Sequence, residues 1–293
     1  MAKVDIVIPT YNRVALLPET LKSLWNQSYP HWRCWIAEDG TTQATMDAAK
    51  PFLEDKRFLY LPGKHIGNPA ALRNRAIIEG NAEYIAFLDD DDLWLPEKLE
   101  CQVEFMTRHP GCVLLGCNAY RWSGAGAWTP SLPLYFKRAR FGQVAYVDLV
   151  QDNYFINSSV VIRRTVLQQS GLFNETIPAP AEDYELWLRI GTLGEAWLMP
   201  EPMVVYRENV STFYPRLDRH QSYHLKAKIF EFALKGVAGI PSPLSYPENS
   251  RYAAACRREQ DFYLAGPRFL GRFKHEILSN IRNHPVSFIR RGL

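Results

Sequence analysis

In the first 120 residues, short apolar runs typical of strands alternate with segments whose apolar residues have the spacing of a helix. Short runs rich in β-branched and aromatic residues are typical of buried strands, and they occur at 4–9, 33–38, 58–61, 84–88 and 112–118. The segments between them have apolar residues at helical spacing: 15–26, 45–53, 68–80 and 96–109. These repeated strand and helix units predict an α/β fold with a Rossmann-like, doubly wound, mostly parallel sheet flanked by helices.

The pattern changes after Arg121. Gly124, Gly126, Pro130 and Pro133 mark irregular loops, which we expect to face a substrate. Residues 251–293 then combine nine Lys/Arg and three Asp/Glu with apolar residues at partly helical spacing. Such a segment can lie on an anionic membrane surface, or it can pack on the main domain with a cationic outer face. We do not expect nucleic acid as a partner, because no nucleic-acid-binding motif accompanies the charge.

Composition is that of an ordinary soluble globular protein, with 293 residues, 47% hydrophobic residues and a net charge of +3. No run approaches the roughly 20 apolar residues of a membrane span, and a strand pattern begins at Val4, where a signal peptide would have its apolar region. The five cysteines contain no C-x-x-C pair, so we expect reduced thiols. These features together predict a cytoplasmic protein.

Four consecutive carboxylates, at 89–92, directly follow the apolar run 84–88. In an open α/β sheet this is the carboxyl end of a strand, where ligands bind. Carboxylates in one turn repel each other, and a divalent cation that prefers oxygen ligands relieves that repulsion. The alternative is a solvated acidic turn that caps the helix beginning near Pro96.

Three strand ends should converge on one site: 9–13, 38–40 and 89–92. Their side chains suit a nucleotide joined to a pyrophosphate. Tyr11 can stack on a base, and Asp39 can accept a hydrogen bond from a base N–H. Asp89 can accept from ribose hydroxyls, and Asp91 can hold a cation between the phosphates. The chain has neither G-x-G-x-x-G after the first strand nor G-x-x-x-x-G-K-[ST], which disfavours dinucleotide oxidoreductases and P-loop NTPases.

Five motifs in this order resemble the GT-A-fold nucleotide-sugar glycosyltransferases of family 2. The motifs are Val4 to Arg13, Glu38 to Thr41, Leu72 to Ala76, Phe87 to Asp92, and Ala181 to Asp183, so the resemblance covers about 3–210. It implies an inverting transferase with a DXD motif, a divalent cation (Mn²⁺ or Mg²⁺) and a nucleoside diphosphate sugar donor.

The resemblance also assigns residue roles. Nucleotide-sugar binding would fall to Pro9, Thr10, Tyr11, Arg13, Asp39, Arg73, Asp89 and Asp90. Asp91 and Asp89 would bind the metal, although Asp90 can share either role because four aspartates leave the register open. Without the family match, Arg73 reads as an exposed helix charge. We expect Asp92 to cap the following helix.

Inversion at an anomeric carbon requires a base that takes the proton of the acceptor. Asp183 is the predicted base, because it lies where a loop with two prolines ends and a helix begins. Glu182 is the competing candidate. The alternative for both acids is simple stabilisation of the helix N-terminus.

One position departs from the family pattern. Asn209 stands where the family often has a histidine that helps to bind metal or diphosphate, and Arg207, Asn209, His220 or His224 could substitute. His65 is expected to be structural. Trp94 and Trp187 are candidates for stacking on the sugar or acceptor, with core packing as the alternative.

These observations predict a metal-dependent inverting glycosyltransferase of polysaccharide biosynthesis, with a UDP-sugar favoured as donor. The acceptor would be a glycan, a lipid-linked sugar or another hydroxyl compound, and the basic tail would bring the enzyme to the inner face of the cell membrane. The alternatives are a non-catalytic nucleotide-sugar binding protein and a sugar-nucleotide nucleotidyltransferase. We expect a catalytic domain at 1–215, with a nucleotide-sugar half at about 1–118 and an acceptor half at about 119–215. A helical, basic extension should follow at 216–293.

Overall fold

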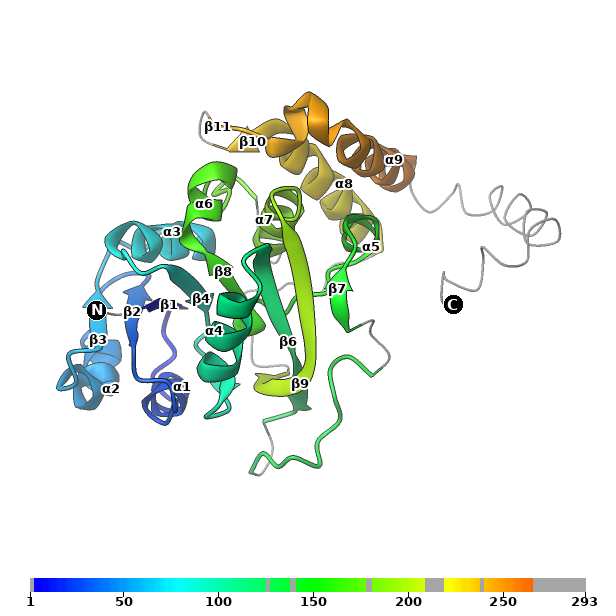
Figure 1. Cartoon of the computed structure of the whole chain (residues 1–293). Coiled ribbons are helices and arrows are strands. Elements are labelled where there is room, and N and C mark those ends of the chain that lie inside the picture. The colour runs from blue at the N-terminus through cyan, green and yellow to red at the C-terminus, as the bar shows by residue number, and fades with distance from the viewer. Residues whose placement is uncertain are drawn as a thin grey trace.

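A computed structural model describes residues 3–124, 127–137, 141–177, 181–208, 219–237 and 240–265. Within these ranges one mixed sheet has the strand order β3-β2-β1-β4-β8-β6-β9-β5, and β7 pairs with β9 (Figure 1). A separate hairpin joins β10 (Gly236–Val237) to β11 (Ile240–Pro241). The main sheet therefore runs without a break through both predicted halves of the catalytic domain.

Most strands of the main sheet run in one direction. The mutually parallel strands are β1 (Val4–Thr10), β2 (Trp32–Glu38), β3 (Phe58–Leu61), β4 (Tyr84–Phe87), β6 (Cys112–Trp122) and β9 (Glu195–Arg207). The antiparallel ones are β5 (Leu93–Trp94), β7 (Gly142–Val144) and β8 (Val161–Arg163). The predicted mostly parallel sheet is confirmed, whereas the three short antiparallel strands were not predicted.

Helices cover both faces of this sheet, as a doubly wound fold requires. One face packs on α1 (Leu17–Trp25), α2 (Gln43–Leu53) and α4 (Lys98–Arg108). The other packs on α3 (Pro69–Glu79), α5 (Tyr146–Gln151), α6 (Arg164–Ser170) and α7 (Glu182–Ile190). Strand β1 contributes side chains to both cores, because Ile6 and Ile8 face the first set of helices while Val7 faces the second.

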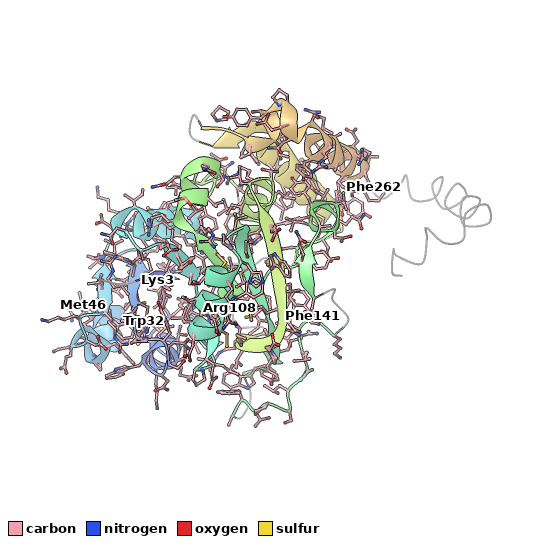
Figure 2. The ribbon with its side chains drawn as sticks, viewed as in Figure 1. Lys3, Trp32, Met46, Arg108, Phe141 and Phe262 are labelled. Atoms are coloured by element: carbon pink, nitrogen blue, oxygen red, sulfur yellow. The ribbon has the colours of Figure 1, made fainter. Side chains whose placement is uncertain are left out.

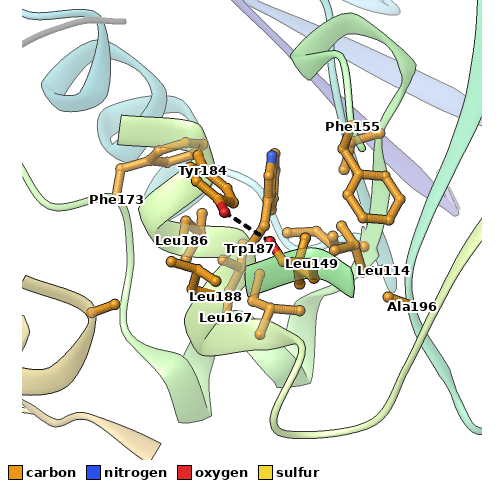
Figure 3. Close-up of a cluster of buried hydrophobic side chains, with 14 of the residues drawn as sticks. Leu114, Leu149, Phe155, Leu167, Phe173, Tyr184, Leu186, Trp187, Leu188 and Ala196 are labelled. Atoms are coloured by element: carbon orange, nitrogen blue, oxygen red, sulfur yellow. Dashed lines mark hydrogen bonds between the residues drawn. The ribbon is translucent and has the colours of Figure 1, made fainter. Parts of the chain in front are cut away.

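Large aromatic side chains fill both cores. On the first face Trp32, labelled in Figure 2, packs edge-on against Phe58 at 5.2 Å between ring centroids. On the second face Trp187 lies among leucines and Phe173 in a fully buried position, and the Tyr184 hydroxyl donates to the Leu149 carbonyl at 2.8 Å (Figure 3). Helix α7 is thus fixed firmly against the sheet.

The chain continues into a helical region beside α7. It contains α8 (Arg219–Lys235), two short 3₁₀ turns (Pro243–Ser245 and Pro247–Asn249) and α9 (Ser250–Ala265). Helix α8 packs on α9 and on α7 (Figure 1). The remaining basic tail, 266–293, lies outside the described residues. Among the helices that are described, none combines the length and the apolar character that a bilayer crossing demands.

A buried carboxylate ties the centre of this sheet together. Asp5 on β1 is fully buried and accepts hydrogen bonds from Arg33 Nη2 at 3.0 Å and Arg164 Nη2 at 2.7 Å. It also accepts from Trp35 Nε1 and from the backbone N–H of Ala82. The segments joined in this way are β1, β2, the connection before β4, and α6. All five cysteines are free thiols, as predicted.

Candidate active site

Two neighbouring pockets open at the carboxyl ends of the parallel strands. The first, which we term the arginine pocket, is lined by Pro9, Thr10, Tyr11, Arg13, Pro69, Leu72, Arg73, Asp89, Asp90, Asp91, Tyr206 and Arg207. The second, the Asp183 pocket, has a volume of about 360 Å³ and is lined by Arg73, Asp89, Tyr135, Asn153, Phe155, Ile156, Asn157, Glu182, Asp183 and Tyr206. The two pockets share Arg73, Asp89 and Tyr206, so they form one continuous site.

The acidic turn after β4 is anchored from beneath. Thr20 on α1 donates to the backbone carbonyls of Asp90 and Asp92, at 3.0 Å in each case. The side chain of Asp92 is buried and accepts from the backbone N–H of Arg207 at 2.9 Å. The prediction that Asp92 caps the next helix is therefore wrong: α4 begins at Lys98 without a side-chain cap, and Asp92 instead holds the end of β9.

Asp90 and Asp91 lie close together in the arginine pocket. Burial, followed by the charge of Asp91, raises the pKa of Asp90 to about 7. Burial, followed by the charge of Asp89, raises the pKa of Asp91 to about 6. Arg13 opposes these shifts, with Nε 3.8 Å from Asp90 Oδ1 and Nη2 3.6 Å from Asp91 Oδ2. The raised pKa values mean that burial and mutual repulsion disfavour the ionised form of these acids. A bound cation would stabilise that form.

Arg207 borders the same acids from β9. Its Nε donates to the Asp91 carbonyl at 2.9 Å, and its Nη2 lies 2.7 Å from Glu19 Oε2. The guanidinium also covers the Trp122 ring at 4.2 Å from the centroid. Arg207 thus lines the arginine pocket in a fixed position, and its contact with a ligand stays a prediction.

Tyr11 lies at the rim of the arginine pocket, stacked on His65 with ring centroids 4.6 Å apart. His65 is held in turn by Asp39, whose Oδ2 is 3.0 Å from His65 Nδ1. Asp39 also accepts from the backbone N–H groups of Ile66 and Gly67, at 2.5 and 2.8 Å. Asp39 is fully buried and is not part of the pocket lining. A direct contact between Asp39 and a base stays a prediction.

Arg73 links the two pockets through a buried ion network. Its Nη2 donates to Asp89 Oδ1 and its Nη1 to Glu182 Oε1, both at 2.8 Å. Asn157 Nδ2 donates to the same Asp89 oxygen at 2.9 Å. Arg73 is 3% exposed, so the alternative that it is an ordinary exposed charge on a helix is wrong. The network connects α3, the acidic turn and the first turn of α7.

Asp183 projects from the first turn of α7 into the second pocket. Burial, followed by the charge of Glu182, raises the pKa of Asp183 to about 8. Its neighbour Glu182 is almost fully buried and accepts from Arg73. Both candidate bases line this pocket, and Glu182 is the one whose carboxylate accepts the 2.8 Å hydrogen bond from Arg73.

The two tryptophans proposed to stack on sugar are core residues, so that prediction is wrong. Trp187 is fully buried against Phe173 (Figure 3). It also contacts Phe87, with ring centroids 6.0 Å apart. Trp94 is 3% exposed, and its indole N–H donates to the Ser158 carbonyl while Lys98 Nζ lies 3.8 Å from the ring centroid. Neither ring lines the arginine pocket or the Asp183 pocket.

Three further candidates were Asn209, which replaces the family histidine, and the downstream His220 and His224. Asn209 and the side chain of His220 lie outside the described residues. His224 is exposed on α8 and lines neither pocket. Sequence reasoning missed Tyr135, Asn153 and Asn157, which line the second pocket from segments without a recognisable motif, and it gave no role to Tyr206, which directly precedes Arg207.

The acids of the first pocket fit a divalent cation by their chemistry. Asp89 and Asp91 offer hard carboxylate oxygens at the pocket wall. Mg²⁺ and similar ions commonly bind through one or two carboxylates together with substrate phosphates, without an all-protein cage. In the described part of the chain no three His, Cys, Asp or Glu side chains are grouped to hold a metal. The donor set present is the two-carboxylate kind.

Comparison with known proteins places these features in context. A model of glycosyl transferase family 2 matches residues 5–171. An uncharacterized glycosyltransferase of Rickettsia bellii is 31% identical over 191 residues, which are 65% of this chain but only 26% of that relative. The Escherichia coli UDP-Glc:alpha-D-GlcNAc-diphosphoundecaprenol beta-1,3-glucosyltransferase WfgD is 30% identical over 106 residues, 36% of this chain and 42% of WfgD. The fold is similar to that of Staphylococcus aureus TarS in complex with UDP-GlcNAc, with a TM-score of 0.67, 17% identity, and coverage of 88% of this chain and 72% of TarS.

Proposed function

This chain belongs to glycosyl transferase family 2, and on that premise we propose that it is a metal-dependent, inverting glycosyltransferase. It transfers a sugar from a nucleoside diphosphate sugar, a UDP-sugar being favoured, to the hydroxyl of a glycan or lipid-linked acceptor. The observation that carries the proposal is the junction of the two pockets at Arg73 and Asp89. A cation and diphosphate suit one side of this junction, and an acceptor hydroxyl beside Asp183 suits the other.

The arginine pocket would hold the donor. Pro9, Thr10 and Tyr11 line it where a base and ribose can lie, and Asp89 and Asp90 offer acceptors for ribose hydroxyls. Asp91, with Asp89, would hold Mn²⁺ or Mg²⁺. When bound, that ion neutralises charge on the leaving diphosphate. Arg207 adds a fixed positive charge at the same wall.

Asp183 is the proposed general base, because Glu182 is already committed to Arg73. The 2.8 Å hydrogen bond from Arg73 Nη1 already occupies Glu182 Oε1. Asp183 has a pKa raised to about 8 by burial and by Glu182, so it is a stronger base than an ordinary carboxylate. It would take the acceptor proton as the acceptor oxygen attacks the anomeric carbon opposite the leaving diphosphate. No covalent enzyme intermediate is needed.

The proposed acceptor rests on the name of one relative, and the proposed cellular location rests on the basic C-terminal segment. WfgD, by its name, glucosylates a diphosphoundecaprenol-linked sugar, and a lipid-linked acceptor is proposed here by analogy. We further propose a catalytic domain at 1–215, whose donor half ends near 118, and an extension at 216–293. The nine basic residues of 251–293 would attract this cytoplasmic enzyme to the anionic inner face of the membrane.

Ligand-induced thermal stabilisation of the full chain, followed by a turnover assay, tests the proposal. A nucleotide at 100 times its Kd should add about 2.7 kcal/mol of stability, which raises the Tm by several degrees. We expect this shift with UDP or a UDP-sugar plus Mn²⁺ and not with chelator. Asp91→Ala should abolish the metal-dependent shift, whereas Asp183→Asn should retain it and lose turnover. Binding without turnover on any acceptor panel would instead indicate a non-catalytic binding protein.

A further inference from the structure

Two consecutive residues in the first turn of α1 hold two different parts of the arginine pocket. Thr20 donates to the backbone carbonyls of Asp90 and Asp92 and so fixes the acidic turn. Its neighbour Glu19 accepts from Arg207 Nη2 at 2.7 Å, across 188 positions of sequence. One helical turn therefore sets the acids and the arginine of the pocket relative to each other.

The guanidinium of Arg207 is held on three sides. Its Nε donates to the Asp91 carbonyl at 2.9 Å, its Nη2 donates to Glu19, and its plane covers the ring of Trp122 at 4.2 Å from the centroid. Arginine carries N–H donors on all three guanidinium nitrogens. Within the described part of the chain, Nη1 is the nitrogen without a hydrogen-bond partner. Arg207 lines the arginine pocket, so Nη1 is the donor that is left for a ligand there.

Glu19 contributes to this arrangement from outside the site. It lines neither the arginine pocket nor the Asp183 pocket. Its side chain is 51% exposed, whereas that of Arg207 is 5% exposed. Glu19 also lies in the first turn of α1, where the helix N-terminus stabilises a negative charge. Its carboxylate can therefore affect a ligand in the arginine pocket through the guanidinium that it holds.

We propose that Glu19 is a positioning residue of the donor site: it fixes the Arg207 guanidinium so that Nη1 stays available to the donor diphosphate. This inference rests on the proposed function, since it requires a diphosphate in the arginine pocket. An arginine that is already fixed loses less side-chain freedom when its ligand binds. None of the five sequence motifs contains Glu19, and its role follows from the contact that the fold creates with β9.

Two substitutions at position 19 separate the contact from the charge. Glu19→Ala removes the acceptor for Nη2, so UDP with Mn²⁺ should bind about two- to tenfold more weakly, as expected when one long side chain must be ordered on binding. Glu19→Gln keeps an acceptor oxygen and should bind UDP within about twofold of the unchanged protein. If Glu19 acted by its charge alone, both variants should instead bind the anionic ligand more tightly. Uridine, which has no diphosphate, should bind equally to all three proteins.

A double-mutant cycle tests whether Glu19 acts through Arg207. Arg207→Gln should weaken the binding of UDP with Mn²⁺ about 10- to 100-fold, because a charged hydrogen bond to phosphate is lost. Glu19→Ala should have no further effect in that background, whereas an effect on the fold in general would persist. Thermal unfolding checks the fold of each variant. If Arg207→Gln does not fold, the comparison of Glu19→Ala with Glu19→Gln decides by itself.

The measurement is titration calorimetry of the full chain with UDP plus Mn²⁺ and with uridine. Glu104→Ala is the matched control, because Glu104 is a 55% exposed acid that pairs with Arg108, itself 72% exposed, on α4 (Figure 2). This control should leave both affinities unchanged. Equal or tighter UDP binding by Glu19→Ala, or the same loss in the Arg207→Gln background, would overturn the inference and leave the proposed function intact. An unchanged protein that binds no UDP would overturn both.

Discussion

The two halves of the site manage their charges differently. In the arginine pocket Asp90 and Asp91 lie 3.8 and 3.6 Å from Arg13, and burial together with the charge of neighbouring acids raises the pKa of both. In the Asp183 pocket Arg73 and Glu182 form a buried ion pair, with Arg73 Nη1 2.8 Å from Glu182 Oε1. The first half therefore concentrates carboxylates whose charge a bound cation would neutralise. The second is a rigid frame beside Asp183, the proposed base.

Replacing Asp183 should produce the largest effect and separate the two halves. Asp183→Asn removes the proposed base but leaves the shape of the second pocket, so kcat should fall by about 10²–10⁴, the usual contribution of general-base catalysis. Donor affinity, measured by calorimetry with UDP and Mn²⁺, should not change. Glu182→Gln is the comparison variant and should retain far more activity. A fully active Asp183→Asn enzyme would remove Asp183 from the mechanism.

Breaking the rigid frame should cost stability. Arg73→Met leaves the buried Glu182 and the half-buried Asp89 without their shared partner, which should lower the free energy of unfolding by about 3–5 kcal/mol. Urea denaturation measures this loss. The surface variant Arg108→Gln should change stability by no more than about 0.5 kcal/mol. Equal losses in the two variants would show that the frame is not a structural element.

The pH dependence of activity should report the pKa of Asp183. The base must be ionised, and its pKa is raised to about 8, so kcat/KM should increase with pH up to about 8 and then level off. Glu182→Gln removes a charge that raises this pKa, so the rise should move to lower pH. Initial rates from about pH 5.5 to about pH 9 test both statements. A profile that is identical in the two proteins would dissociate Glu182 from Asp183.

The smallest expected effect concerns the arginine pocket. Asp90 and Asp91, with pKa values of about 7 and 6, bind protons in competition with a metal ion. The increase in Tm caused by Mn²⁺ should therefore be larger at about pH 8 than at about pH 5.5. Asp91→Asn should flatten this dependence. A stabilisation independent of pH would place the ion away from these acids.

The sequence predicted the first half of the site better than the second, for a physical reason. The donor residues follow strands β1 and β4 within short motifs, so local pattern and the parallel-sheet rule suffice to bring them together. The second pocket collects Tyr135, Asn157 and Tyr206 from loops and strand ends that are ordered by tertiary packing. The antiparallel strand β8 between β4 and β6 has three residues, too few for a periodic signal.

The wrong predictions have the same origin. Trp94 and Trp187 have the composition of sugar-binding residues, but their burial depends on neighbours that are distant in sequence, Ser158 for one and Phe87 and Phe173 for the other. Asp92 looks like a helix cap by position, yet the end of β9, 115 residues later, takes its carboxylate. Local spacing contains no information on such partners.

The buried Asp5 has a consequence for the order in which the chain can fold during synthesis. Its carboxylate lies on β1, but one of its two arginine partners, Arg164, is made 159 residues later. Until then a charge at the centre of the sheet lacks a partner that it needs in a buried position. The nascent chain should therefore stay incompletely folded until α6 has emerged, although the donor motifs are long since complete. A fragment ending at residue 150 should be digested rapidly by protease, whereas one that extends through the end of α9 should resist.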